Sequence, residues 1–280
     1  MKIKSKKLKI FLSRKLSVVA AVIFIFMMLA LIIGPFITPH DPHQMYLPSR
    51  FHGISGTHWL GADHLGRDLF TRIIHGGILS VGLAFFSVSL GLSIGTLFGL
   101  ISGYYGGILD GLISRFIDFL MAVPTFMIAI ISLTILGSGG INTGIAVGVS
   151  LIPLFMRISR SQVIEVKESD YVKACLITGM SSLRIITNHI LPGIFPILIV
   201  TFTLNLGKAL LASSAIAFLG IGVNPPNIEW GALLSAGRDT MIMLYFPLGI
   251  IAPGLAIMLF VMCTSLIADG LRDALDPKAK

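Results

Sequence analysis

The side chains best suited to chemistry are histidines, and they are unevenly distributed. Six of the seven lie within residues 38–77, and imidazole is a common ligand of nickel, copper and zinc. Their spacings place no repeated i, i+4 pair on one helix face, so the sequence predicts no metal site among them. Without H-E-x-x-H, a Ser/Lys arrangement or a G-x-x-x-x-G-K-[ST] phosphate loop, we also expect no catalytic residue and no cofactor. The six histidines within residues 38–77 are His40, His43, His52, His58, His64 and His75.

Few charged side chains interrupt the apolar stretches of the chain. Lys208 lies deep in one stretch, three residues after Asn205, and an ionisable group inside a membrane normally faces protein or a water-filled path. We interpret Asn205 and Lys208 as candidate pathway-lining residues, with snorkelling or a structural hydrogen bond as the alternative. Arg115 and Asp118 are three apart at the start of another stretch, a spacing that predicts a structural ion pair.

The composition indicates which elements hold these side chains. With 55% hydrophobic and only 12% charged residues, much of the chain requires lipid as its solvent. A helix needs about 20 apolar residues to cross a membrane. We therefore expect an all-α polytopic membrane protein with six transmembrane helices. The predicted spans are Leu16–Ile37, Ile78–Ser102, Phe119–Leu136, Ile141–Ile158, Ile194–Phe218 and Leu244–Ala268.

The distribution of basic residues predicts the orientation of these spans. With the N-terminus inside, sixteen of the 21 basic residues fall on the inner side and four on the outer side, as the positive-inside rule requires. The first span then acts as an uncleaved signal anchor, since its apolar part is too long for a signal peptide. We expect a multi-pass protein of the cell (inner, cytoplasmic) membrane with both termini cytoplasmic. The basic residues are not interleaved with aromatics on one surface, which argues against nucleic acid as a partner.

Two stripes of glycine recur every fourth residue. Such stripes let helices touch backbone to backbone, which is a main source of association in lipid. We expect tight helix contacts along both, within the chain or between chains. The stripes consist of Gly91, Gly95, Gly99 and Gly103, and of Gly140, Gly144 and Gly148.

The outer segment from Trp59 to Arg72 carries alternating charges. The spacing predicts pairs between Asp63 and Arg67 and between Asp68 and Arg72 on a short helix at the membrane edge. Exposed pairs of this kind contribute only about 0.3–0.5 kcal/mol each. We expect them to position the segment.

The longest predicted inner loop, residues 159–193, is polar yet patterned. Asp170 is a plausible N-cap for a short helix through Thr178, and Gly179 suits the left-handed turn that ends it. A second helix is expected from Ser181 or Ser182, before Pro192. Two short amphipathic helices joined at a glycine form a knob that fits a groove on a partner protein better than it fits catalysis. The apolar face of the second helix is predicted to be Leu183, Ile186 and Ile190.

The same loop resembles the coupling-loop motif of binding-protein-dependent ABC importer permeases. The stretch Asp170-Tyr-Val-Lys-Ala-Cys-Leu-Ile-Thr-Gly179 and the later Leu191-Pro192 match the pattern Glu-Ala-Ala, three residues, Gly, with a Leu-Pro pair further on. Lys173, Ala174 and Cys175 stand at the triplet, so the acidic residue and one alanine are lost. The residues assigned to coupling are Asp170, Tyr171, Lys173, Ala174, Gly179, Arg184, Leu191 and Pro192.

Other segments extend the resemblance over most of the chain from about Thr57 to Asp276. His58-Trp-Leu-Gly-Ala-Asp-His-Leu-Gly-Arg-Asp68 and Ala217-Phe-Leu-Gly-Ile-Gly-Val-Asn-Pro-Pro226 are similar to the C-type subunit of the dipeptide, oligopeptide and nickel permease family. That family often carries a glutamate where this chain has Ser213, which we keep as a candidate pathway residue without assuming a carboxylate there.

The resemblance implies a type I importer permease fold, with a basic cytoplasmic tail (1–15), a first span plus external segment (16–77), a permease core (78–272) with a cytoplasmic coupling loop (159–193), and a cytoplasmic C-terminus (273–280). It also implies membrane lipid as solvent and three kinds of partner: a second homologous permease, two ATP-binding subunits that hydrolyse the ATP, and an extracytoplasmic solute-binding protein. The implied cargo is peptides, nickel or a metal chelate such as a metallophore.

Two other readings stay open at this stage. A secondary transporter driven by an ion gradient needs intramembrane carboxylates, and the central spans offer none beyond Asp118 near an end. A non-transporting membrane assembly protein is the second alternative. A membrane enzyme is disfavoured by the missing catalytic motifs.

Overall fold

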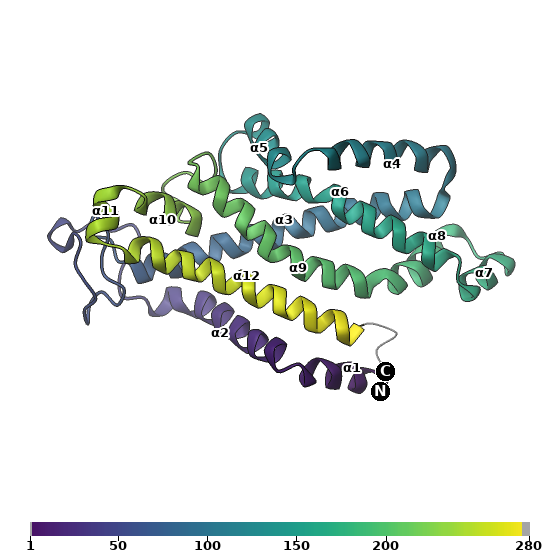
Figure 1. The fold of residues 1–280 in the computed structure, drawn as a ribbon, viewed down its shortest axis with the longest axis horizontal. Coiled ribbons are helices and arrows are strands. Elements are labelled where there is room, and N and C mark those ends of the chain that lie inside the picture. Colours follow the sequence, from purple (N-terminus) through teal and green to yellow (C-terminus); the bar gives the residue numbers. More distant parts are fainter. Residues whose placement is uncertain (1, 276–280) are drawn as a thin grey trace.

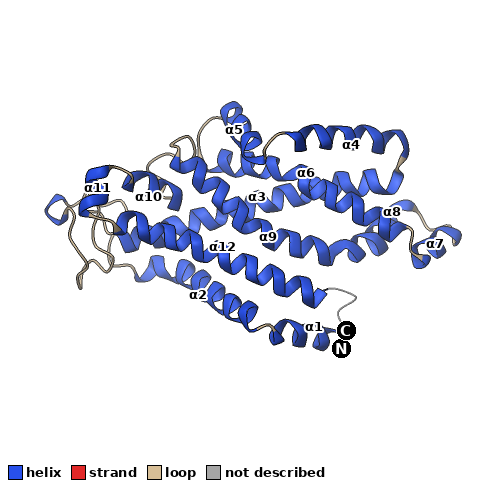
Figure 2. Cartoon of the chain, viewed as in Figure 1, coloured by secondary structure: helices blue, strands red, loops and turns tan. Residues whose placement is uncertain are grey.

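The computed structural model describes residues 2–275, which form helices and connecting loops without a strand (Figure 2). The long helices run side by side, and α7 and α8 lie at the same end as α1 and the last turn of α12 (Figure 1). We call this the terminal end; the loop end carries residues 38–68, α10 and α11. The helices are α1 Lys2–Ser13, α2 Lys15–Ile37, α3 Leu69–Tyr105, α4 Gly107–Ala122, α5 Thr125–Leu136, α6 Gly140–Lys167, α7 Asp170–Ile177, α8 Ser182–Ile185, α9 Leu191–Phe218, α10 Trp230–Gly237, α11 Thr240–Tyr245 and α12 Leu248–Leu275.

The predicted spans correspond to five helices long and apolar enough to cross a membrane, with a bent helix pair as the sixth. Their limits differ from the predicted ones for identifiable reasons. Helix α3 begins at Leu69, nine residues before the predicted start, because the Asp68 carboxylate caps its N-terminus by accepting the Thr71 N–H at 2.8 Å. The last span begins at Leu248, since Leu244 belongs to the separate helix α11. Residues 276–280 of the predicted C-terminal segment lie outside the described residues.

The third span is not the continuous helix that the sequence predicts. Helices α4 and α5 meet at an angle of 94°, and Val123 between them has extended backbone angles (φ −92°, ψ 132°). Pro124 explains the break, because proline disfavours helical geometry in the preceding residue and has no N–H for the helix ladder. The break gives the molecule a bend whose inner side faces α6 and α9.

Helices α3 and α6 form the most extensive helix–helix contact among the described residues. A Cβ atom added to Gly95 would lie 2.7 Å from the Ile152 carbonyl oxygen, a separation that real Cβ atoms do not adopt. Gly91, Gly99 and Gly103 meet α6 in the same way. The predicted backbone-to-backbone packing is therefore confirmed as a contact within the chain. Close helix contact is also confirmed at Gly144 and Gly148 of the second stripe. At Gly140 an added Cβ would meet no atom closer than 3.9 Å, so this position makes no close contact.

Candidate coupling surface and translocation pathway

The segment 169–190 forms a helical knob at the terminal end (Figure 1). Ser169, not Asp170, is the N-cap residue of α7, and Asp170 is its first helical residue. Gly179 ends α7 with φ +75°, and its N–H and that of Met180 donate to the carbonyls of Leu176 and Cys175 at 3.1 and 3.2 Å. This is the Schellman arrangement. The predicted left-handed glycine turn is confirmed.

The second helix of the knob begins where the sequence predicts but is much shorter. Helix α8 covers only Ser182–Ile185 and continues through a π-turn, Ile186–Ile190, directly into α9. The predicted apolar face is wrong at Leu183, which is 72% exposed. Ile185 is buried instead of Leu183. The π-turn changes the number of residues per turn, so the α-helical spacing used to predict the apolar face does not hold between α8 and Ile190. A displacement of the knob therefore reaches α9 without an intervening flexible loop.

A small hydrophobic core fastens the knob to the long helices. Val172, Ile185 and Ile190 are completely buried and pack with residues of α3, α6 and α9. The Tyr171 hydroxyl lies against the start of α9, 3.2 Å from the position a Cβ would take on Gly193. Because these contacts hold both halves of the knob, it moves with the helices beneath it.

The knob also carries large apolar side chains that are exposed among its polar ones. Ile177 is 86% exposed, and Leu176 and Leu183 are exposed beside it in the sequence of the knob. A cluster of exposed apolar side chains is typical of a surface that binds a partner. Of the eight residues assigned to coupling, Asp170, Tyr171, Lys173, Ala174, Gly179 and Arg184 lie exposed in the knob, while Leu191 and Pro192 form the first turn of α9.

The bend between α4 and α5 encloses a cavity of about 330 Å³ against α6 and α9. Its lining includes two of the three residues predicted to line a pathway, Asn205 and Lys208. Ser213 is not among them; it is 1% exposed and its hydroxyl donates to the Leu210 carbonyl at 3.0 Å. Asn205 and Lys208 thus line one cavity, which the bend at Pro124 forms, and their role in a pathway stays a prediction.

Asn205 and Lys208 line this cavity, and each has a polar group without a hydrogen-bond partner among the described residues. The Asn205 amide nitrogen donates to the Thr201 carbonyl at 2.7 Å, while its Oδ1 atom is buried without a hydrogen-bond partner. Lys208 is exposed, and no described residue forms an ion pair or hydrogen bond with it. Buried or intramembrane polar groups left without partners are expensive. Of the two, only Lys208 is exposed, so it provides a cation for a polar ligand in the cavity.

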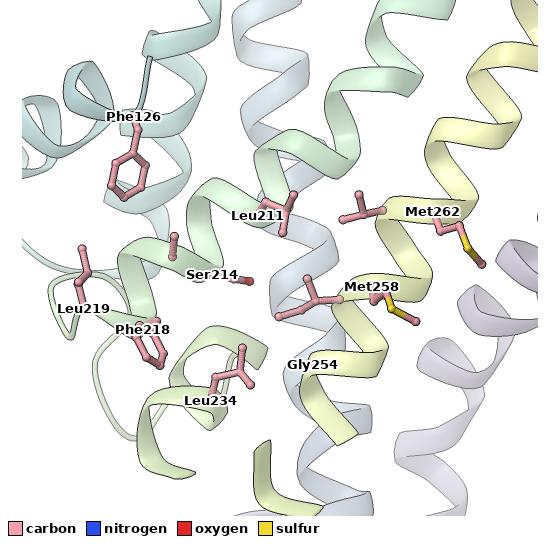
Figure 3. A pocket seen from close by; sticks show the side chains of 12 residues that line it. Phe126, Leu211, Ser214, Phe218, Leu219, Leu234, Gly254, Met258 and Met262 are labelled. Carbon is pink, nitrogen blue, oxygen red and sulfur yellow. The ribbon is translucent and has the colours of Figure 1, made fainter. Parts of the chain in front are cut away.

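A larger, open cavity of about 890 Å³ lies between α5, α9, α10 and α12 (Figure 3). Its lining is apolar, with Phe126, Met258 and Met262 on its walls, and Ser214 contributes a hydroxyl. Methionine adapts easily to differently shaped neighbours. This cavity has the composition of a surface that packs against lipid or protein rather than of a polar binding site.

Glu229 is a buried carboxylate that the sequence reasoning missed. It is fully buried, and its Oε1 atom accepts from Ser214 at 2.9 Å and lies 3.2 Å from the Ser80 hydroxyl. Its Oε2 atom accepts the Ala232 N–H at 3.1 Å, which caps α10. Through these contacts one carboxylate joins α3, α9 and α10. No sequence signal identifies it, because glutamate is not among the residues preferred at N-cap positions and its partners lie far away in the chain.

The charged residues of α4 pair with α6, not with each other. Asp118 accepts from Arg157 at 2.6 Å, so the predicted pairing of Asp118 with Arg115 is wrong. Asp110 forms a two-pronged contact with Arg160, at 2.5 and 2.7 Å. Helices α4 and α6 are antiparallel neighbours across the bend, a contact that spacing within α4 alone does not reveal. These pairs fix the terminal end of α4 to α6.

The outer segment is a structured loop rather than the predicted short helix. The Asp63–Arg67 pair is confirmed at 2.8 Å. The predicted Asp68–Arg72 pair is wrong, because the Asp68 carboxylate is used by the α3 cap and by His58 at 2.9 Å, while Arg72 lies 3.9 Å from Asp63. Burial is the largest effect on His64 and lowers its pKa.

Comparison with known proteins gives consistent matches over the sequence. Residues 95–280 match the family described as "Binding-protein-dependent transport system inner membrane component", and residues 7–53 match the "N-terminal TM domain of oligopeptide transport permease C". The dipeptide transport system permease protein DppC of Alkalihalophilus pseudofirmus is 41% identical over 95% of this chain and 87% of its own. The glutathione transport system permease protein GsiD of Pectobacterium atrosepticum is 39% identical over 94% and 87%.

A solved structure agrees with the fold. The inward-facing MetNI methionine ABC transporter matches with a TM-score of 0.56 at 16% identity, covering 71% of this chain and 96% of that one. At this identity the match concerns the fold alone. The predicted all-α polytopic fold of the type I importer permeases is confirmed.

Proposed function

Because the chain belongs to the family of binding-protein-dependent transport system inner membrane components, we propose that it forms one half of a peptide-import pathway in the cell membrane. The other half is a second, homologous permease. Two ATP-binding subunits hydrolyse the ATP, and an extracytoplasmic binding protein delivers the peptide. The terminal end faces the cytoplasm, in keeping with the basic residues concentrated on that side.

The observation that carries this proposal is the two-sided knob 169–190. One side is buried in a core with α3, α6 and α9, and the other presents exposed apolar residues such as Ile177. A surface anchored in this way binds a moving partner and passes its displacement to the helices. The direct connection through the π-turn into α9 gives the route.

The cavity at the α4–α5 bend is the proposed part of the pathway in this subunit. Peptides carry a carboxylate, and Lys208 offers an unpaired ammonium within the bilayer region. Asn205 lies three residues earlier on the same helix, and its buried side chain forms part of the wall beside Lys208. We assign peptide carboxylate recognition to Lys208, which also explains how a charge is tolerated at this depth.

Peptides are favoured as cargo over nickel or a metal chelate. The relatives at 41% and 39% identity are named for dipeptide and glutathione transport. The lining residues of the proposed pathway include an ammonium, an amide and hydroxyls, and no carboxylate, imidazole or thiolate. Such a lining suits an anionic or zwitterionic organic solute better than a free metal cation.

Co-purification tests the coupling role of the knob. The full-length chain, expressed with the other subunits of its transporter, is expected to retain an ATP-binding subunit, and Ile177→Glu is expected to release it because a charge is placed in the contact. Ile54→Glu is the matched control: Ile54 is also an exposed isoleucine, 68% exposed, but lies at the loop end. Equal retention by both variants would contradict the assignment.

A further inference from the structure

We propose that the loop end binds a transition-metal ion, of the zinc, nickel or copper class, between His40, His58 and Asp68. One ligand atom from each of these three residues lies within 4.8 Å of the others. This ion is a resident ligand of the outer segment and is distinct from the transported cargo. The spacing of the histidines along the sequence does not reveal it, since the fold, not a helix face, brings the residues together.

Asp68 and His58 form the preorganised half of the site. Both are largely buried, at 3% and 9% exposed, and Asp68 Oδ1 lies 2.9 Å from His58 Nδ1. The Asp68 Oδ2 atom is held by the N–H and the hydroxyl of Thr71, at 2.8 and 2.7 Å. The carboxylate is thus fixed on the first turn of α3. A carboxylate beside a histidine either ligates the metal with it or orients the ring for ligation.

His40 supplies the second imidazole from a different part of the chain. Its ring stacks on that of His58 with centroids 4.7 Å apart and planes at 21°. The Nε2 atom of His40 lies 2.8 Å from the Thr57 carbonyl oxygen, which leaves Nδ1 as its available ligand atom. Fixing one ring nitrogen by a carbonyl is the usual way a protein orients a metal-binding histidine.

The separations are close to what a metal requires. Ligand atoms around a tetrahedral zinc ion with bonds of about 2.1 Å lie about 3.4 Å apart. The ligand atoms of the three residues now lie within 4.8 Å of one another. Rotation of the half-buried His40 ring would bring its ligand atom to the shorter separation. His52 lies within reach as a further ligand, because its exposed ring has its centroid 5.9 Å from that of His58. The remaining positions suit water.

The donor set decides the class of ion. Two imidazoles with one carboxylate suit zinc, nickel and copper, whereas magnesium and calcium prefer oxygen ligands alone. The bound ion connects residues that follow α2 with the first turn of α3, and so stiffens the outer segment at the loop end. A purely structural His58–Asp68 contact, without affinity for metal, is the alternative that the experiment excludes or establishes.

The test is direct metal binding to the full-length chain, purified in detergent without a polyhistidine tag. Calorimetric titration with Zn²⁺ is expected to show one binding site per chain. With Co²⁺ in place of zinc, we expect an absorption spectrum typical of nitrogen and oxygen ligands. His40→Gln is the decisive variant, because its amide nitrogen can still donate to the Thr57 carbonyl while the metal-binding Nδ1 is lost. We expect affinity to fall at least tenfold.

His43→Gln is the matched control, because His43 is exposed in the same segment but is not one of the three ligands. It is expected to bind zinc as the parent does. His40→Asp is expected to restore binding by returning a ligand atom. Equal affinities in the His40→Gln and His43→Gln variants, or no saturable zinc binding to the parent chain, would overturn the proposal. Neither result bears on peptide import, since the readout is metal binding alone.

Discussion

Helices α3 and α6 are packed against each other along four turns, whereas α9 is approached closely by α12 and α10 at two separate levels and is bordered by cavities. Glycines of α3 bring the α6 backbone into contact at every turn from Gly91 to Gly103. On α9 comparable approaches occur at Gly207, where an added Cβ would lie 2.8 Å from Thr264 Oγ1 on α12, and at Ser214, whose backbone a Cβ added to Gly231 of α10 would overlap. The cavities of about 330 and 890 Å³ both border α9 and share Phe126 of α5 in their linings.

This difference separates a rigid part of the molecule from a part able to rearrange. Close packing without voids resists small displacements, so α3 and α6 behave as one body. Helix α9 is continuous with the knob through the π-turn and borders both cavities. We therefore expect motion imposed on the knob to appear around α9, while the α3–α6 contact stays intact.

The largest effect is expected from filling the α3–α6 contact. In Gly95→Leu the new side chain meets backbone atoms of Ile152 and Met156, which cannot move aside as a flexible side chain does. The cost should exceed about 3 kcal/mol, the upper part of the range for overpacked cores. Melting of the purified chain in detergent, read by the monodisperse fraction after heating, measures it.

Gly82→Leu is the control for that change. Gly82 lies on the same helix, but an added Cβ meets nothing within 4 Å. Its melting curve should match that of the parent. If Gly95→Leu also melts like the parent, the contact between α3 and α6 is not the closely packed, rigid contact described above.

A smaller effect, on transport rather than folding, is expected from Lys208→Met. A charge-assisted hydrogen bond contributes about 1.5–3 kcal/mol, so uptake of a peptide with a free carboxylate at low concentration should fall roughly ten- to hundredfold. Lys208→Arg should retain most of it. The same peptide with an amidated C-terminus should lose little between parent and Lys208→Met. An equal loss for both peptides would show that Lys208 has a structural role.

Glu229→Gln probes how the loop end of α9 is fixed. The substitution keeps the shape of the side chain but replaces one carboxylate oxygen with an NH₂ group, which cannot accept a hydrogen bond. At least one of the present donors, the Ser214 hydroxyl or the Ala232 N–H, then loses its acceptor, which should lower the free energy of unfolding by about 1–3 kcal/mol. The melting temperature should fall accordingly. Glu165→Gln, at an exposed position of α6, should change stability by less than about 0.5 kcal/mol. Identical melting of the two variants would remove Glu229 as the link between α3, α9 and α10.

The smallest effect is expected from Met258→Ala on the wall of the open cavity. Met258 is half-exposed, so its truncation creates no enclosed void and should cost less than about 0.5 kcal/mol in the isolated chain. Thermal melting of the isolated chain measures this. A loss as large as that of a buried methionine, about 2–5 kcal/mol, would mean that the cavity is closed and α12 is packed as tightly as α6.

Much of the fold follows from features that are local in the sequence. Apolar run length predicts the spans, and glycine every fourth residue predicts a tight helix contact without naming its partner. Gly179 predicts the turn in the knob because few other residues adopt φ +75° without strain. The break at Pro124 could also have been recognised from proline chemistry, although the apolar run across it favoured a continuous span.

The residues that local patterns failed to place depend on contacts between distant segments. Glu229 meets Ser80, 149 positions earlier, and Asp118 meets Arg157, 39 positions later. His40 and His58 stack although no helix joins them. No periodicity within one element encodes such contacts, so the sequence places Lys208 in a span but does not show that Lys208 faces the bend at Pro124.

The proposed role of the knob is to transmit conformational change between the ATP-binding subunits and the permease. The most direct test is peptide-stimulated ATP hydrolysis by the complete transporter in proteoliposomes with Gly179→Val. An added Cβ at Gly179 meets nothing within 4 Å, so the strain lies in the backbone turn alone. We predict normal assembly with stimulation abolished, while Gly53→Val, also free of contacts and without a positive φ, behaves as the parent. Full stimulation in Gly179→Val would contradict the account.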